Sequence, residues 1–436
     1  MFWKKQESEQ VIFDRYYKTL LHDGKLVPVG MLLQRATQRL PDNIALIQQG
    51  KNISYRQLYG AAVRFSKVLQ QQGVKANDRV ILLMENSPSF YVAYFGIMQL
   101  GAIVATVNTF LREREVAHIL EDAKPTVIVV SSDLKKIVTD SGPITVPLLT
   151  ELDMEFKDDE PAQLPEFPVV LLEPDALCCL LYTSGTTGFP KGVMLSSRNI
   201  LTNVLQALTR FHVGPEDRIF AVLPLFHSFA ENACIWIPMV VGCTVIVVPK
   251  IERRFILEGL DYKPTLFVGV PALFGLLCLL KTAPLSSIRL FVSGGDVLPD
   301  KIRAAFALLY RRNICSGYGL TESSPMVSGD IEDVTVQTNN VGHPILGVQV
   351  SFRDEEGREV APGSVGHICI KGDNIMLGYY NSPDTTAEVI KDGWLLTGDL
   401  GYLDEQGRLV ISGRLKDLII HKGFNIYPPE IENVIL

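Results

Sequence analysis

The stretch Leu177-Cys-Cys-Leu-Leu-Tyr-Thr-Ser-Gly-Thr-Thr-Gly-Phe-Pro-Lys-Gly192 carries an apolar run directly into a loop of glycine and hydroxyl residues. The run Leu177–Tyr182 predicts a buried strand. Gly185 and Gly188 allow backbone N–H groups to approach an anion closely, and Lys191 adds a cation. The hydroxyl groups belong to Thr183, Ser184, Thr186 and Thr187. We therefore predict that this loop holds a polyphosphate.

An ordinary solvated turn is the competing interpretation of the loop, because glycine-rich turns are common. Four hydroxyl groups and a lysine within ten residues, directly after an apolar strand, disfavour that interpretation. The loop also differs from the Walker pattern, since Lys191 follows proline rather than glycine and is not followed by Ser or Thr.

Strand-like and helix-like segments alternate on both sides of the loop, which predicts an α/β fold with mainly parallel sheets. The expected strands are 79–84, 103–107, 126–130, 219–223, 244–248, 266–270 and 289–293, and the expected helices include 89–101, 112–123 and 198–211. From Gly342 onward strands are shorter and turns are frequent, so we expect a small β-rich subdomain there.

Composition narrows the class of protein. Hydrophobic residues make up 47% and charged residues 20% of the 436 residues, which is typical of globular proteins. The formal net charge is −7, which argues against nucleic acid as the main partner. The N-terminus lacks the apolar segment of a secretory signal, and the apolar run Ala233–Pro249 is short for a membrane span. Seven cysteines without Cys-x-x-Cys spacing favour reduced, buried thiols and a cytoplasmic location.

Three further blocks carry chemically useful residues, although each alone is also consistent with an ordinary turn. In Ser316-Gly-Tyr-Gly-Leu-Thr-Glu322, the ring of Tyr318 suits a flat base and the Glu322 carboxylate suits Mg²⁺. Asp399 follows a glycine, a position from which a carboxylate binds vicinal ribose hydroxyls. A charged junction follows, with Arg414, Lys416 and Asp417, and it is either a hinge or a solvated linker.

In their order and spacing the four blocks resemble the adenylate-forming superfamily, which includes acyl-CoA synthetases, peptide-synthetase adenylation domains and luciferases. The resemblance covers roughly residues 30 to 436. It implies an adenylating domain over 1–415, with α/β subdomains at about 30–175 and 176–340 and a β-rich subdomain at 341–415. Residues 416–436 would begin a C-terminal lid.

The resemblance also implies roles for particular residues in binding ATP. Thr183 to Lys191 would hold the β- and γ-phosphates, Tyr318 would stack on adenine, and Thr321 would contact the α-phosphate. Glu322 would bind Mg²⁺. Asp399 and Arg414 would hold the ribose, and Lys416 would be the hinge of the lid. Further expected members of the nucleotide and acyl walls are Gly294, Gly295, Asp296, Ser316, Gly317 and Gly319.

One departure from the family concerns the lid. In the family a lysine near the end of the lid enters the site for adenylation, and residues through Leu436 do not include it. The last residues resemble the first turns of a helix, so a chain cut short is expected. The resemblance then implies that this chain binds nucleotide and acyl group but exchanges pyrophosphate with ATP weakly.

The substrate is predicted from two segments. Leu223-Pro-Leu-Phe-His-Ser-Phe229 resembles the family block that lies between the acyl and thiol sites, so His227 and Phe229 are expected beside the acyl group. A histidine satisfied at a strand end is the alternative. Val270 lies in a second segment, Val268–Leu277, which has no ionic residue. An amino acid would need a buried acid for its ammonium group, so we predict a medium- to long-chain fatty acid.

Several alternatives remain open. The thiol acceptor is CoA or acyl carrier protein, and peripheral membrane contact and the oligomeric state are not determined by the sequence. A family member without a lid would act only as an acyl or nucleotide binder. His118 and Asp122 have an acyltransferase-like spacing, but their segment has the pattern of an amphipathic surface helix. A serine hydrolase is disfavoured because no Gly-x-Ser-x-Gly occurs.

Overall fold

The computed structural model describes residues 8–162, 167–184, 189–280, 283–331, 339–417, 419–421 and 424–426. Gly185, Thr186, Thr187 and Gly188 of the expected phosphate loop lie outside these residues, as does the helix expected near the end of the chain. For Ser184 and for residues from 419 onward only the backbone is described.

The first sheet is mainly parallel, as predicted. Its order within the described residues is β19-β10-β9-β6-β5-β7-β8. Strands β5 to β9 are parallel, and β10 and β19 are added antiparallel at one edge. The strands are β5 (Arg79–Leu83), β6 (Ile103–Thr106), β7 (Val127–Val130), β8 (Leu148–Leu149), β9 (Leu177–Ser184), β10 (Pro190–Ser196) and β19 (Gly378–Tyr379).

The second sheet has a parallel centre and antiparallel edges. Its order within the described residues is β16-β15-β14-β13-β11-β12-β3-β4. The strands are β3 (Ile44–Gln48), β4 (Lys51–Ser54), β11 (Arg218–Ala221), β12 (Thr244–Val247), β13 (Leu266–Gly269), β14 (Leu290–Ser293), β15 (Cys315–Gly319) and β16 (Met326–Gly329).

A third, antiparallel sheet confirms the β-rich segment predicted after Gly342. Its order is β17-β18-β21-β20, with β22 paired to β21. The strands are β17 (Gln349–Arg353), β18 (Gly366–Lys371), β20 (Ile390–Lys391), β21 (Trp394–Leu403) and β22 (Leu409–Arg414). Short antiparallel pairs also join β1 (Leu21–His22) to β2 (Lys25–Leu26) and β23 (Ile419–His421) to β24 (Phe424–Ile426).

The two large sheets are not divided at residue 175, where the sequence placed a subdomain boundary. Strands β9 and β10 lie beyond that residue yet complete the first sheet, and β3 and β4 lie before it yet complete the second. Hydrophobic periodicity identifies a buried strand but not the sheet that it joins, because pairing partners are set by tertiary packing. The chain therefore passes from the second sheet to the first after β4 and back to the second after β10, and β19 later rejoins the first sheet.

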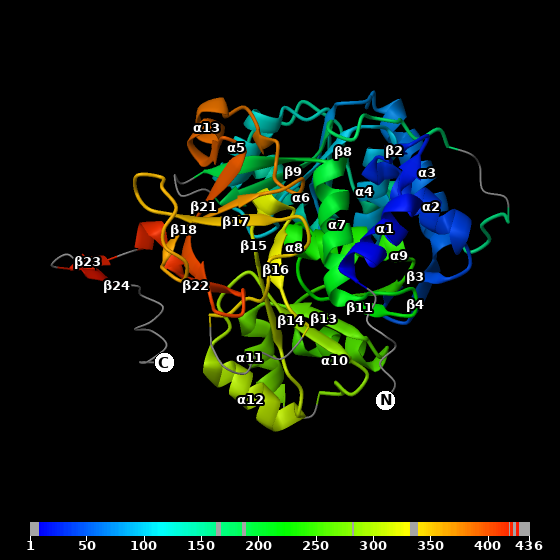
Figure 1. The fold of residues 1–436 in the computed structure, drawn as a ribbon. Helices are drawn as coiled ribbons and strands as arrows, with labels where there is room; N and C mark the ends of the chain where they lie inside the picture. The colour runs from blue at the N-terminus through cyan, green and yellow to red at the C-terminus, as the bar shows by residue number, and fades with distance from the viewer. Residues whose placement is uncertain are drawn as a thin grey trace.

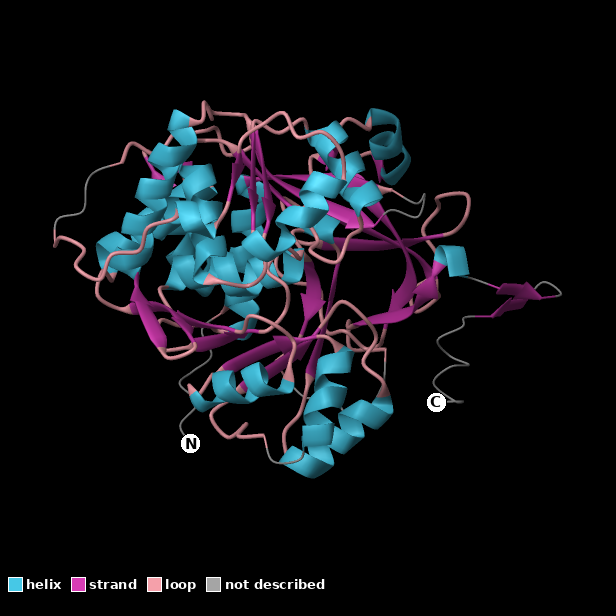
Figure 2. Ribbon diagram, turned by 180° about the vertical axis from the view of Figure 1, so that it is seen from behind, coloured by secondary structure: helices cyan, strands magenta, loops and turns pink. Residues whose placement is uncertain are grey.

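Helices cover both large sheets (Figures 1 and 2). They are α1 (Glu9–Thr19), α2 (Leu32–Arg39), α3 (Tyr55–Gln71), α4 (Pro88–Gln99), α5 (Glu113–Ala123), α6 (Lys135–Asp140), α7 (Ser197–Phe211), α8 (Ser228–Glu231), α9 (Ile237–Val241), α10 (Arg253–Asp261), α11 (Pro271–Leu280), α12 (Asp300–Tyr310) and α13 (Pro383–Val389). A π-helix, η4 (Asn232–Trp236), continues α8, and short 3₁₀ turns are η1 (Val29–Met31), η2 (Ser132–Leu134), η3 (Glu151–Asp153), η5 (Thr321–Ser323) and η6 (Leu415–Asp417).

One continuous core joins the two large sheets. It includes α3, α4, α7 and η4, one face of the first sheet, and both faces of the second sheet with residues of α10, α11 and α12. A smaller core lies under α5 and α6 on the other face of the first sheet. Residues of α4 are apolar nearly all round, and all of them from Phe90 to Gln99 are buried, as expected for a helix enclosed on every side. Helices α10, α11 and α12 lie beyond the second sheet, on the side away from α7 (Figure 1).

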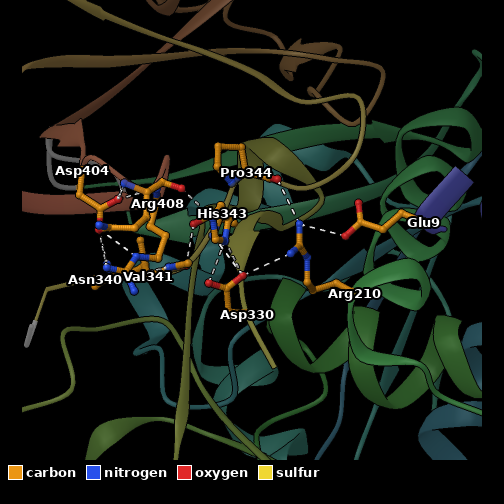
Figure 3. Close-up of polar contacts among 12 residues, drawn as sticks. Glu9, Arg210, Asp330, Asn340, Val341, His343, Pro344, Asp404 and Arg408 are labelled. Atoms are coloured by element: carbon orange, nitrogen blue, oxygen red, sulfur yellow. Dashed lines mark hydrogen bonds and ion pairs between the residues drawn. The ribbon is translucent and has the colours of Figure 1, made fainter. Parts of the chain in front are cut away.

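A polar network fixes the third sheet against α7 (Figure 3). Arg210 on α7 forms ion pairs with Glu9 of α1 and Asp330, both at 3.2 Å. Asp330 in turn contacts Nδ1 of His343 at 3.0 Å, and the other ring nitrogen lies 3.0 Å from the Gln406 carbonyl oxygen. The turn after β21 is therefore held at a fixed position relative to the helix that borders the cavity described next.

Among the described residues, no helix combines the length and apolar character needed to cross a membrane. None of the seven cysteines, all within the described residues, forms a disulfide, and all but the half-buried Cys278 are buried, as predicted.

Candidate active site

A single cavity of about 700 Å³ collects residues from all four sequence blocks. It lies where the second sheet, α7 and α8 meet the third sheet. One half is polar, and its charged side chains are Lys191, Glu322, Glu388, Asp399, Arg414 and Lys416. The other half is apolar. Both the size and this division are usual for a small-molecule site.

The expected phosphate loop connects two strands that pair antiparallel, a feature that the sequence did not predict. Strands β9 and β10 pair antiparallel, with Thr183 opposite Lys191. Both residues line the cavity. The loop is followed by a strand, β10, whereas a helix follows the loop of the Walker pattern. The difference in sequence thus accompanies a difference in structure. The hairpin places the Lys191 side chain at the polar half of the cavity.

Tyr318 of the second sheet and Asp399 of the third sheet are in contact. Tyr318 lies on β15, and its hydroxyl donates to Oδ2 of Asp399 at 2.6 Å. Asp399 on β21 is paired in register with Arg414 on β22, whose Nε lies 3.4 Å from Oδ1. Burial raises the pKa of Asp399, and the Tyr318 hydrogen bond and the Arg414 charge oppose that rise. The carboxylate is thus oriented by two groups at the wall of the cavity.

Glycines of β15 and of the segment after β14 are required by close packing. A side chain at Gly319 would come within 1.9 Å of the Pro325 carbonyl oxygen, and one at Gly294 would lie 3.3 Å from the Phe229 ring. Gly295 has a φ of +83°, which favours glycine. Gly294, Gly295, Gly317 and Gly319 all line the cavity. Their lack of side chains leaves this wall flat.

His227 begins α8 at the boundary between the polar and apolar halves. Its Nδ1 accepts a hydrogen bond from the backbone N–H of Phe229 at 3.3 Å, so the ring caps the helix as well as facing the cavity. The ring is reachable by solvent but surrounded by protein, and this desolvation lowers its pKa. Ser228, which the sequence did not single out, lies 3.1 Å from the hydroxyl of Thr321.

The apolar half is a tunnel between α7 and the second sheet. Its lining includes Ala207, Phe211, Val213, Ile219, Ala233, Ile237, Leu266, Val268, Leu290 and Val292. From Gly294 to Leu290 the strand direction gives the tunnel a depth of about 13 Å, at about 3.3 Å per residue. No charged side chain of the cavity lies on α7, β11, β13 or β14 within the described chain.

Glu231 on α8 is an ionic residue beside the apolar half, and it points away from the tunnel. Its carboxylate is fully buried and accepts hydrogen bonds from Tyr94 at 2.9 Å and Thr106 at 2.8 Å. Burial raises its pKa to about 7. These contacts connect α8, which carries His227, to α4 and to β6 of the first sheet.

Three expected site residues lie outside the cavity lining. Asp296 is exposed, and its Oδ1 accepts from the backbone N–H of Val297. Ser316 accepts a hydrogen bond from Arg303 of α12. Val270 packs near Gly295 instead of facing the tunnel. The expected residues that the structure does bring together at the cavity are Thr183, Lys191, His227, Phe229, Thr321, Glu322, Tyr318, Asp399, Arg414 and Lys416.

The acyltransferase alternative gains no support from the structure. His118 lies on α5 with its ring centroid 4.7 Å from that of Phe189. Asp122 accepts hydrogen bonds from the Tyr182 hydroxyl at 2.8 Å and from Asn381 at 3.0 Å. Neither residue lines the cavity, so the amphipathic-helix interpretation holds.

Comparisons with known proteins agree with this site. A family model described as AMP-binding enzyme matches residues 33–380. A long-chain-fatty-acid–CoA ligase of Salmonella typhimurium is 33% identical over 93% of this chain and 80% of its own length.

Two solved structures have the same fold. The anthranilate CoA ligase AuaEII, in complex with anthranoyl-AMP, has a TM-score of 0.86 at 24% identity, over 93% of this chain and 80% of its own. The o-succinylbenzoate CoA synthetase MenE of Bacillus subtilis, in complex with ATP and magnesium, has a TM-score of 0.84 at 28% identity, over 93% and 84%.

Proposed function

The chain belongs to the AMP-binding enzymes, a family of adenylate-forming acid–CoA ligases, and from this premise we propose that its acid substrate is a long-chain fatty acid. ATP and CoA are the co-substrates of this activity. The observation that carries the proposal is the apolar tunnel, which extends about 13 Å from the polar half along the strand direction. Its apolar walls suit an alkyl chain, whose burial is favourable in proportion to its area.

The first half-reaction needs positioning more than side-chain chemistry. The carboxylate oxygen of the acid attacks the α-phosphorus of ATP, and pyrophosphate leaves. In the proposed arrangement Lys191 and Thr183 bind the β- and γ-phosphates, and the Thr321 hydroxyl binds the α-phosphate. Their donors would stabilise the negative charge that spreads over the phosphate oxygens in the transition state.

The nucleoside would lie across the junction of the second and third sheets. Tyr318 would stack on adenine, and Asp399 with Arg414 would bind the ribose hydroxyls. The hydrogen bond from Tyr318 to Asp399 places these two groups in fixed relation before nucleotide binds. Lys416, at the exposed end of the cavity, is proposed as the hinge for movement between half-reactions.

Magnesium fits the polar half of the cavity. Glu322 and Thr183 offer oxygen ligands there, which Mg²⁺ prefers. No group of three potential metal ligands occurs among the described residues, as expected for an ion held mainly by nucleotide phosphates and water. When bound, the ion would neutralise phosphate charge during adenylation.

The second half-reaction transfers the acyl group to a thiol. The thiol sulfur attacks the acyl carbon, the thioester forms, and AMP leaves. His227 and Phe229 lie between the two halves of the cavity, where they would border the path of the thiol. CoA is the proposed acceptor, with acyl carrier protein as the alternative, and a cytoplasmic location would supply both.

The experiment is a single-turnover assay of acyl-adenylate formation by mass spectrometry. The acids are saturated fatty acids of increasing length, anthranilate and o-succinylbenzoate, and CoA or acyl carrier protein is added afterwards. We expect adenylates of long aliphatic acids and thioesters with CoA. Preference for an aromatic acid would contradict the fatty-acid proposal. The rate of ATP–pyrophosphate exchange in the same samples measures the first half-reaction separately.

A further inference from the structure

Tyr379 occupies a position between two functional segments that are far apart in the sequence. It lies on β19, which pairs antiparallel with β10, so that Tyr379 is opposite Val193. Val193 lies two residues after Lys191 on β10, so Tyr379 lies on the strand next to Lys191 and close to it along the chain direction. Its side chain lines the polar half of the cavity. None of the sequence blocks includes it.

The side chain contacts two of the charged groups of this half, Glu322 and Lys191. The hydroxyl donates to Oε1 of Glu322 at 2.8 Å. The Nζ of Lys191 lies over the ring, 5.5 Å from its centroid, within the range of a cation–π interaction. The backbone N–H of Tyr379 donates to the hydroxyl of Thr386 at 2.9 Å, which holds the residue in place.

The hydroxyl of Tyr379 acts as a donor to Glu322. Burial, and next the negative charge of Glu322, raise the pKa of Tyr379, so the phenol stays protonated. A donor on Oε1 leaves Oε2 of Glu322 free. The carboxylate is thereby oriented without being neutralised by a cation.

Lys191 and Glu322 carry opposite charges and contact different parts of Tyr379, Lys191 over the face of the ring and Glu322 at the hydroxyl. In the described parts of the chain, neither has a partner of opposite charge within the 4.0 Å of an ion pair. A direct pair between them would occupy the ammonium group needed for phosphate and the carboxylate needed for Mg²⁺. Such pairs form readily when geometry allows, because opposite charges attract strongly in a partly desolvated site.

We propose that Tyr379 is a positioning residue that keeps Lys191 and Glu322 apart and orients the Glu322 carboxylate toward the metal. The ring separates the two charges, and the hydroxyl fixes the carboxylate. The inference rests on the proposed function for the roles of Lys191 and Glu322. It adds a residue whose own contact with ATP is not required.

Two substitutions separate the ring from the hydroxyl. Tyr379→Phe keeps the ring and removes the hydrogen bond, which contributes about 0.5–1.5 kcal/mol in proteins. We therefore expect Mn²⁺, titrated by electron paramagnetic resonance into the complex with ATP, to bind about 3- to 10-fold more weakly. The affinity for ATP in EDTA should change less than twofold.

Tyr379→Leu removes the ring as well, so Lys191 and Glu322 can pair. We expect the affinity for ATP in EDTA to fall about 10-fold or more, measured by calorimetry. Adding Glu322→Gln to Tyr379→Leu should restore most of that affinity, because glutamine cannot form the ion pair. The same Glu322→Gln change in the wild-type background should alter the affinity much less, so the double-mutant cycle is strongly coupled.

Tyr380→Phe and Tyr380→Leu are the matched controls. Tyr380 is the next residue, lies against Gly192, and does not line the cavity. Thermal melts would establish that every variant is folded. Equal ATP affinity for Tyr379→Leu and wild type, or equal effects of Glu322→Gln in both backgrounds, would overturn the proposal. A wild-type chain that binds no ATP would instead contradict the proposed function.

Discussion

The two halves of the cavity are built in different ways. The polar half draws on short contiguous blocks, and many of its residues lie in strands: Thr183 in β9, Tyr318 in β15, Asp399 in β21 and Arg414 at the end of β22. The tunnel draws on single residues spaced along α7, η4, β11, β13 and β14. Binding of phosphate and ribose depends on a few exact donors, whereas binding of an alkyl chain depends on shape and on the absence of charge.

This difference predicts how each half fails when it is changed. Loss of one polar group should remove a large part of the activity for every acid. A change in the tunnel should depend on the length of the acid, and a change beneath the tunnel should affect stability more than substrate choice.

Lys191→Ala should have the largest effect. It removes the cation that the hairpin presents to the polar half, where developing charge is stabilised. We expect the single-turnover rate of adenylate formation to fall by about 10²- to 10³-fold, as for loss of one transition-state donor. Lys301→Ala, at an exposed site on α12, is the control and should retain the wild-type rate. A loss confined to long acids would contradict the assignment of Lys191.

Glu231→Gln should change the pH dependence of stability. Burial raises the pKa of Glu231 in the folded chain from its ordinary 4.5 to about 7, so the folded chain favours the protonated acid. Its contribution is fully present below pH 4.5 and is lost as pH rises through 7. Wild type should therefore lose up to about 3 kcal/mol of unfolding free energy between pH 4.5 and 7 that the variant, which does not titrate at this position, keeps.

Denaturant unfolding at several pH values measures this trend. Glu355→Gln, at an exposed turn, is the control and should show no comparable divergence from wild type. A difference between Glu231→Gln and wild type that stays constant with pH would show that the carboxylate is not held in its protonated form.

Ala207→Phe should have a smaller and more selective effect. Ala207 is buried and lines the tunnel from α7, so a ring there would occupy the space of the alkyl chain. We expect the rate for a long acid to fall by about 10-fold, since a few methylene groups contribute about 0.8 kcal/mol each. Short acids should be nearly unaffected. Ala304→Phe, at an exposed position on α12, is the control. Equal losses of rate for all acids with Ala207→Phe would indicate damage to the fold and not a change in the tunnel.

The same contrast explains what could be predicted from the sequence. The sequence predicted the strands at 79–84 and 244–248 and the helix at 198–211, because their apolar patterns are local. Thr183, Tyr318 and Asp399 could be identified as candidate site residues because they lie in contiguous blocks. The pairing of β10 with β9 was missed, since the Pro190–Ser196 strand follows a glycine-rich turn and has no clear alternation.

The tunnel and Tyr379 could not be predicted because they depend on tertiary packing. Ala207 and Leu290 are ordinary core residues by pattern, and only the gap between α7 and the second sheet gives them a role. Tyr379 approaches Lys191 only because β19 joins the edge of the first sheet after a connection of more than 180 residues. The family resemblance implied that Asp296 belongs to the wall, but its side chain is exposed to solvent.

The most direct test of the central claim is a crystal structure of this chain with a non-hydrolysable long-chain acyl-adenylate analogue. One cavity is claimed to hold both parts of the intermediate. We predict adenine against Tyr318, ribose at Asp399, and the alkyl chain in the tunnel beside Ala207, Val268 and Leu290. An alkyl chain that leaves the cavity for another surface, with the tunnel closed behind the adenylate, would contradict the account.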